Sequence, residues 1–307
     1  MSNLVEIVIP AHNEEHNVPV IYSAIKKAVE GTGYVCKVLF VDDGSTDGTL
    51  DAIQHLAHSN DDVFYISLSR NFGHQNALKA GLDASSADVV IMMDADMQHP
   101  PALIPSLLAA HHEGYDVVYT VRKDNEHISF TKKFTANFFY KIMNYLSEIE
   151  IEPGSADFRL MNRKTLDALL SLPDQEIFYR GLVKWIGFKQ IKIEYEPQAR
   201  HTGETKYSTK KMLQFAITGI ATFSNKPLYF AAYMGFAFAF LSLLYIPYII
   251  YAFYSGTEVH GWASIVATLA FFGGIILMML GIVGIYLGKL FEQSKNRPQY
   301  LVKAAKL

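Results

Sequence analysis

One long stretch of this 307-residue sequence carries almost no charge. Residues 228–288 contain no Lys or Arg and a single acidic residue, Glu258, whereas charged types make up 19% of the whole chain. This partition excludes an intrinsically disordered chain and a purely soluble enzyme, because neither concentrates apolar residues in this way. The single cysteine, Cys36, excludes a disulfide-rich secreted scaffold as well.

The charge-free stretch divides into two segments, residues 228–254 and 263–288, which are separated by a short turn-rich connection. Each segment is longer than the about 20 residues that cross a hydrocarbon core, so we predict a hairpin of two transmembrane helices. Pro247 lies inside the first, where a kink is tolerated, and glycines in the second provide a face suited to helix packing. The length of both segments disfavours the alternative of a buried hairpin in a large soluble core.

Basic residues flank this stretch on both sides, and the connection between the two segments has none. By the positive-inside rule, both termini are expected in the cytoplasm, in a multi-pass protein of the inner (plasma) membrane. The N-terminus has no basic region before its first apolar run, which argues against a signal peptide. The expected division is a catalytic domain (1–208), a juxtamembrane amphipathic helix (209–227), the two membrane helices (228–254 and 263–288) and a cytoplasmic tail (289–307).

Before residue 209, short β-branched runs alternate with segments of helical spacing. Strands are expected at residues 5–10, 34–41, 63–68, 88–93 and 116–121, and helices at 17–29, 46–58, 76–84 and 103–113. The alternation predicts an α/β domain with a mostly parallel, Rossmann-like sheet. In such sheets, ligands bind at the carboxyl ends of the strands.

Oxygen-bearing side chains follow the fourth expected strand. Asp94 and Asp96 end it, and Gln98 comes two residues later, so in an extended chain the three project to one side. These oxygen ligands suit Mg²⁺ or Mn²⁺. The alternative interpretation is a solvated acidic turn before Pro100 and Pro101.

Two further strand ends carry the same kind of residues. Asp42 and Asp43 follow the second strand, and Asn13 and Glu14 follow the first. Capping of the next helix would explain one of the two aspartates, and Asn13 and Glu14 taken alone could also form a cap. Together the three strand ends form an acidic rim, which is costly unless a cation neutralises it, so a metal–diphosphate complex is expected there. No P-loop or Gly-x-Gly-x-x-Gly motif occurs, which disfavours a P-loop enzyme or a standard dinucleotide fold.

Six segments, taken in order, resemble one family. They are residues 9–14, 41–45, 71–74, 93–100, 156–160 and 200–207. This set resembles the polyisoprenyl-phosphate glycosyltransferases of glycosyltransferase family 2, which have the GT-A fold. The two apolar segments near the C-terminus match the bactoprenol branch of that family.

The resemblance implies a functional role for each matching residue. It implies that Asp157 lies beside the reacting centre and acts as a base or as an electrostatic orienter. The alternative for Asp157 is a salt bridge to Arg159 or Arg163. Lys132 and Lys133 stand where relatives often have Arg, which leaves their role in binding the acceptor open. The implied sets are Pro10, Ala11, Asn13, Glu14, Asp42, Asp43 and Asp94 for the nucleotide sugar, Asp94, Asp96 and Gln98 for the metal, and Arg122, Lys132, Lys133, Arg200 and Lys206 for phosphate or acceptor.

The resemblance also implies a reaction. A hexose, with glucose expected, passes from a nucleotide-diphosphate sugar such as UDP-glucose to undecaprenyl phosphate, by a metal-dependent, inverting single displacement. N-acetylglucosamine, mannose, galactose and amino-arabinose donors stay open, as does a non-catalytic membrane scaffold that binds nucleotide sugar. A processive polysaccharide synthase is disfavoured because the Gln-x-x-Arg-Trp signature is absent. We expect a homo-oligomer, such as the tetramer of relatives. We expect no nucleic-acid partner.

Overall fold

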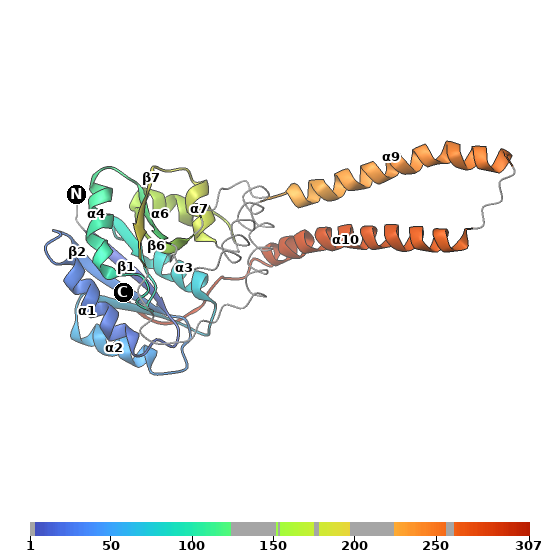
Figure 1. Ribbon diagram of the computed structural model, residues 1–307. Helices are drawn as coiled ribbons and strands as arrows, with labels where there is room; N and C mark the ends of the chain where they lie inside the picture. The colour runs from blue at the N-terminus through green and yellow to red at the C-terminus, as the bar shows by residue number, and fades with distance from the viewer. Residues whose placement is uncertain (1–3, 124–151, 153, 175–177, 197–223, 256–260) are drawn as a thin grey trace. The chain divides into compact units, whose positions relative to one another are not determined.

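The structure is a computed structural model that describes residues 4–123, 152, 154–174, 178–196, 224–255 and 261–307 (Figure 1). The chain divides into two compact units. The first contains residues 1–142, 149–208 and 297–307, and the second contains residues 143–148 and 209–296. The predicted amphipathic helix after residue 209 lies almost wholly outside the described residues.

The first unit is built on an eight-stranded mixed sheet with the strand order β7-β5-β6-β4-β1-β2-β3-β8. β1 pairs in parallel with β2 and β4, β2 with β3, and β5 with β7, whereas β6 and β8 run antiparallel to their neighbours. The strands are β1 (Leu4–Ala11), β2 (Val35–Asp42), β3 (Val63–Leu68), β4 (Val89–Met92), β5 (Val117–Arg122), β6 (Ser155–Asn162), β7 (Gln190–Tyr195) and β8 (Val302–Lys306).

Helices cover both faces of this sheet. One face packs against α1, α2 and α4, and the other packs against α3, α6 and α7. The helices of this unit are α1 (Asn17–Val29), α2 (Thr49–Ser59), α3 (His74–Ala84), the 3₁₀ turn η1 (Pro101–Leu103), α4 (Ile104–His112), α6 (Arg163–Leu170) and α7 (Tyr179–Trp185).

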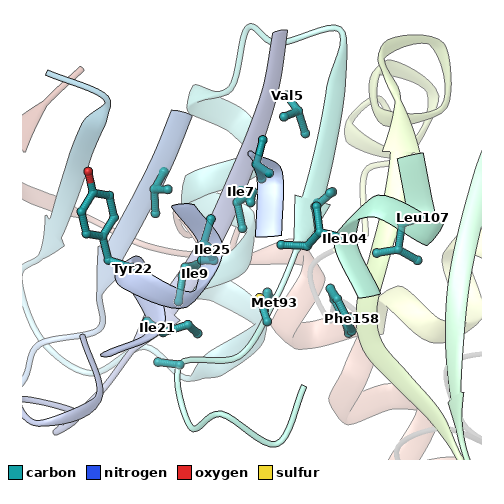
Figure 2. Close-up of a cluster of buried hydrophobic side chains, with 14 of the residues drawn as sticks. Val5, Ile7, Ile9, Ile21, Tyr22, Ile25, Met93, Ile104, Leu107 and Phe158 are labelled. Atoms are coloured by element: carbon teal, nitrogen blue, oxygen red, sulfur yellow. The ribbon is translucent and has the colours of Figure 1, made fainter. Parts of the chain in front are cut away.

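The core on the first face explains why the central strand is so apolar. Figure 2 shows Ile7 and Ile9 of β1 packed with Ile21 of α1 and Ile104 of α4, and all four side chains are fully buried. Phe158 on β6 extends the same cluster. Each buried aliphatic side chain of this kind contributes about 1.5–3 kcal/mol relative to exposure, so this core fixes the position of β1 and of the strand ends beside it.

The five strands and four helices expected before residue 122 are all present, with ends that coincide or differ by at most three residues. The prediction of a mostly parallel sheet was incomplete, because β6, β7 and β8 were not foreseen and two of them reverse direction. β6 carries Asp157 and Arg159 at buried positions, so its sequence lacks the pattern of a purely apolar buried strand. Six of the eight strands nevertheless run in the same direction, as the resemblance to the GT-A fold implies.

The second unit contains two long helices, α9 (Lys226–Tyr254) and α10 (Trp262–Ser294). Both helices fall where the charge-free segments predicted them, and α10 continues past residue 288. Within the described residues, one segment, Ile265–Ser294, is long and apolar enough to cross a membrane, and Lys226–Leu241 is a shorter apolar segment. The structure therefore supports one candidate span and does not establish the predicted two-span hairpin.

Candidate active site

Strand register brings the predicted residues to one edge of the sheet. Ala11 at the end of β1 pairs with Asp42 at the end of β2, and Val8 pairs with Met92 at the end of β4. β6 runs the opposite way, with Arg159 opposite Met92. Asp157 precedes Arg159 by two residues in this antiparallel strand, so it lies level with Asp94 beyond the end of β4.

The two aspartates at the end of β2, Asp42 and Asp43, are buried, and both accept hydrogen bonds from other parts of the protein. Asp42 accepts hydrogen bonds from the Ser45 backbone N–H (3.1 Å) and the Ser67 hydroxyl (3.0 Å). Asp43 accepts from the backbone N–H groups of Phe72 (2.7 Å) and Gly73 (3.0 Å). Both carboxylates thus hold the loops that surround the site, and the binding of nucleotide by Asp43 stays a prediction.

The residues after β1 form hydrogen bonds with the loop after β2. The backbone N–H of Asn13 donates to the Ser45 hydroxyl (3.1 Å), and the Asn13 side-chain oxygen accepts from the Thr46 N–H (2.9 Å). The Glu14 N–H donates to the Thr49 hydroxyl (2.8 Å). Pro10 and Ala11 are buried at the end of β1. All four predicted residues therefore lie together at this edge.

Gly44 permits the turn in which Asp42 and Asp43 stand. Its φ is +61°, and a Cβ atom there would lie 2.3 Å from the backbone carbon of Arg70, far closer than carbon atoms can approach. The close approach keeps the β2 loop against the segment whose N–H groups bind Asp43. A side chain at Gly44 would force these two segments apart.

We expect Gly44→Ala to lower the midpoint of thermal unfolding and to abolish activity. The matched control is Gly31→Ala, because Gly31 has a φ of +79° but no neighbouring atom lies within 4 Å of the place that a Cβ would take. The control should cost about 1–2 kcal/mol from backbone strain alone, and Gly44→Ala should cost several kcal/mol more. Equal effects of the two substitutions on thermal unfolding would contradict the close packing at Gly44.

The acidic pair after β4 lies in a tight turn. Met97 has a φ of +63°, and the Asp96 carboxylate accepts a hydrogen bond from the Gln98 N–H (3.1 Å). The Asp94 Oδ1 atom is buried and accepts no hydrogen bond from the described residues, although the His74 Nε2 atom lies 3.3 Å away. The Gln98 side-chain oxygen accepts from Arg122 at the end of β5 (2.9 Å).

Asp157 is held by cationic and polar groups from two helices. Arg180 of α7 donates to both carboxylate oxygens at 3.0 Å, and the Gln75 amide of α3 donates at 3.3 Å. The His74 Nε2 atom lies 3.9 Å from Asp157, so His74 stands between Asp94 and Asp157. The acidic turn and Asp157 therefore belong to one site.

Buried Arg159 supports Asp157 from the core. Its guanidinium lies 3.8 Å from the Asp157 carboxylate and donates to the backbone oxygens of Ala156 (2.8 Å) and Tyr179 (3.3 Å). The alternative partner Arg163 instead pairs with Asp167 at 2.6 Å. Burial lowers the pKa of Arg159 to about 10 despite the opposing effect of Asp157, so Arg159 stays charged at neutral pH.

The ionisation of Asp157 follows from these contacts. Burial alone would raise its pKa, but the ion pair with Arg180, with further help from Arg159 and His74, holds the pKa well below the ordinary value. A carboxylate with so low a pKa is a weak proton acceptor near pH 7. Sequence reasoning missed Arg180, since no motif includes it; His74 lies in a matched segment without an assigned role.

Four of the predicted phosphate or acceptor residues, Lys132, Lys133, Arg200 and Lys206, lie outside the described residues. Arg122 is the one member of that set whose surroundings the structure describes, and its contact with Gln98 places it beside the acidic turn.

Solved structures share this fold. Glucosyl-3-phosphoglycerate synthase from Mycobacterium tuberculosis, solved in complex with Mn²⁺, uridine diphosphate and phosphoglyceric acid, superimposes with a TM-score of 0.50. The two sequences are 20% identical, and the match covers 71% of this chain and 76% of the synthase. At this identity the likeness shows the fold alone.

Curated relatives match almost the full chain. The uncharacterized glycosyltransferase YkcC of Bacillus subtilis is 39% identical over 97% of this chain and 92% of its own length. The bactoprenol glucosyl transferase of Shigella phage SfV is 36% identical over 98% of this chain and 99% of its own length. The family model of glycosyl transferase family 2 matches residues 6–170, which include Asp42 and Asp43, the acidic turn after β4, and Asp157. The chain is therefore a glycosyltransferase and belongs to glycosyl transferase family 2.

Proposed function

We propose that this enzyme transfers glucose from UDP-glucose to a polyprenyl phosphate such as undecaprenyl phosphate. The observation that carries the proposal is the single site formed by the acidic turn and Asp157, joined by His74 at 3.3 and 3.9 Å. The lipid acceptor is supported by the relative named bactoprenol glucosyl transferase, which matches this chain over 98% of its length. The uridine nucleotide is supported by the fold neighbour with bound uridine diphosphate.

The residues of the acidic turn fit a Mg²⁺ or Mn²⁺ ion. The buried Asp94 Oδ1 atom accepts no hydrogen bond from the described residues, so it can serve as a metal ligand, and Asp96 stands two residues away. Mg²⁺ often takes one or two carboxylates and substrate phosphates, and Asp94 and Asp96 would offer the carboxylates. No cluster of three His, Cys, Asp or Glu side chains suited to a metal occurs in the described part of the chain. The predicted ligand Gln98 has its oxygen engaged by Arg122 in this structure.

The chemistry needs little from a general base. The phosphate monoester of the acceptor has a second pKa near 6, so its attacking oxygen is mostly ionised at neutral pH. That oxygen forms the new bond to the anomeric carbon as the bond to the nucleotide diphosphate breaks, with inversion. A divalent ion bound at Asp94 and Asp96 would stabilise the charge on the departing diphosphate.

The protein's own residues orient the reactants. Asp157 stays ionised and fixes Arg180 and His74 at the reaction centre, so we assign it the role of electrostatic orienter and not of base. We infer that Arg122, which lies beside the acidic turn, contacts the diphosphate. Asn13, Glu14, Asp42 and Asp43 shape the edge where the nucleotide would bind. Fixed charges of this kind need no reorganisation as the charge of the transition state develops.

A membrane location completes the proposal. An isoprenoid tail stays in the bilayer, so the enzyme must meet its acceptor at the headgroup level. We propose that α9 and α10 both span the inner membrane, with the catalytic unit and both termini in the cytoplasm, and that the glycine-rich face of α10 supports a homo-oligomer. The support is one described segment of sufficient length and the basic residues that flank the helices.

The pH dependence of turnover tests the role of Asp157. Because its folded pKa is depressed, its stabilising contribution is present above the unfolded value of about 3.9 and is lost only as the pH falls through the folded pKa. Any acid limb near pH 6 should therefore not come from Asp157, and the acceptor phosphate, whose pKa is about 6, is the group we expect to produce it. We expect the same limb in the residual activity of Asp157→Asn. Its disappearance in that variant would make Asp157 the base.

A panel of donors tests the proposed function itself. Membranes that contain the full chain would be incubated with undecaprenyl phosphate, Mg²⁺ or Mn²⁺ and radiolabelled nucleotide sugars. We expect label in the chloroform phase with UDP-glucose, and less with the N-acetylglucosamine, mannose, galactose and amino-arabinose donors. A stronger signal from another sugar would correct the donor, and no lipid-soluble label with any donor would refute the function.

A further inference from the structure

The chain returns to the catalytic unit after its last helix. The C-terminal tail, residues 297–307, follows α10 and belongs to the first unit. Its strand β8 pairs antiparallel with β3, with Ala304 opposite Ser67 and Val302 opposite Leu68. The Ser69 N–H donates to the Leu301 oxygen at 2.8 Å. The tail therefore forms the outer strand of the sheet.

Two side chains of the tail form hydrogen bonds with residues outside the sheet. The Gln299 amide donates to the backbone oxygen of Asp174 at 2.6 Å. The Tyr300 hydroxyl donates to the Asp83 carboxylate at 2.8 Å, and Asp83 also pairs with Lys79 at 2.7 Å. Asp83 lies in the last turn of α3, and Asp174 lies five residues before the start of α7.

These two helices are the ones that hold Asp157. His74 and Gln75 are the first two residues of α3, and Arg180 is the second residue of α7. All three side chains approach the Asp157 carboxylate, at 3.9, 3.3 and 3.0 Å. The tail thus contacts the far end of α3 through Asp83, and it contacts Asp174, which precedes α7 by five residues.

We propose that Gln299 and Tyr300 are positioning residues, which act through α3 and α7 to keep His74, Gln75 and Arg180 on Asp157. The helix α7 has seven residues, too few to be stable alone, so its placement depends on contacts with its surroundings. The hydrogen bond from Gln299 holds Asp174, five residues before the start of α7. Small displacements of catalytic groups have large effects, since about 1 Å can cost about a hundredfold in rate.

The test uses the full chain with Gln299→Ala and Tyr300→Phe combined. Tyr300→Phe removes the hydroxyl that binds Asp83, and Gln299→Ala removes the amide that donates to Asp174, while the β8 backbone pairing is kept. The matched control is Lys303→Ala, an exposed side chain of β8 in the same tail. Turnover with UDP-glucose and undecaprenyl phosphate, the KM for UDP-glucose, and hydrogen–deuterium exchange of peptides that cover α3 and α7 would be measured for each protein.

We expect the double variant to lose about tenfold or more in kcat, with a KM for UDP-glucose within about twofold of the control. Exchange in α7 and in the first turn of α3 should be faster, while exchange in β1 and β4 should not change. Control-like turnover, or unchanged exchange in α7, would overturn the inference. The kinetic readout rests on the proposed function, and if the wild-type chain fails to glycosylate the lipid phosphate, the exchange measurement still decides the role of the tail.

Discussion

Asp157→Asn is expected to lower turnover by about a hundred- to a thousandfold, which is the usual cost of losing one preorganised charged group at a reaction centre. The substitution keeps the size of the side chain but removes the charge that Arg180 and Arg159 face. Arg159 is 2% exposed, so it would be left buried without its anion. Breaking a buried ion pair in this way costs about 3–5 kcal/mol, and the thermal midpoint should fall with the rate.

An exposed ion pair provides the control for Asp157→Asn. Arg163 and Asp167 pair at 2.6 Å on the surface of α6, with the Asp167 side chain 63% exposed. Asp167→Asn should change the free energy of unfolding by less than about 1 kcal/mol and leave turnover intact. The rates would be compared at a temperature where both variants are folded. Turnover of Asp157→Asn within about threefold of the control would contradict the role given to Asp157.

Asp96→Asn is expected to abolish transfer while the protein still folds and inserts into membranes. The substitution removes one of the two carboxylates that would hold the divalent ion, and without this ion the departing diphosphate loses its main stabilisation. For the same reason, EDTA should stop the wild-type reaction, and added Mg²⁺ or Mn²⁺ should restore it. Binding of Mn²⁺ with uridine diphosphate, measured by calorimetry, should weaken strongly in the variant.

Asp61→Asn is the matched control for Asp96→Asn. Asp61 is an exposed carboxylate in the turn before β3, so its loss changes the net charge by the same amount. The control should bind Mn²⁺ with uridine diphosphate as the wild type does. Retained transfer in Asp96→Asn, or wild-type activity in EDTA, would refute the metal assignment.

The strand ends were predictable because local patterns fix them. Alternating apolar runs and helical spacings located β1 to β5 and α1 to α4, and parallel pairing then necessarily brings their carboxyl ends to one edge. This is why Asn13, Asp42 and Asp94 all follow or end strands at the same edge of the sheet. The charge-free segments likewise predicted α9 and α10, since length and composition alone determine them.

The remaining features depend on contacts between distant residues. Arg180 reaches Asp157 because α7 packs against β6, and the spacing of residues along the sequence does not predict that contact. The engagement of both Asp43 oxygens by the N–H groups of Phe72 and Gly73 depends on the Gly44 turn. The strand β8 follows a helix of the second unit, so its pairing with β3 could not be inferred from local alternation.

The lipid product made by the purified full chain from UDP-glucose, undecaprenyl phosphate and Mg²⁺ tests the central claim most directly. Its mass and the anomeric configuration of its sugar would be determined by mass spectrometry and NMR. We predict one glucose per lipid phosphate in the β configuration, because a single displacement inverts the α-linked donor. An α-linked product, or free glucose and uridine diphosphate with no glycosylated lipid, would contradict it.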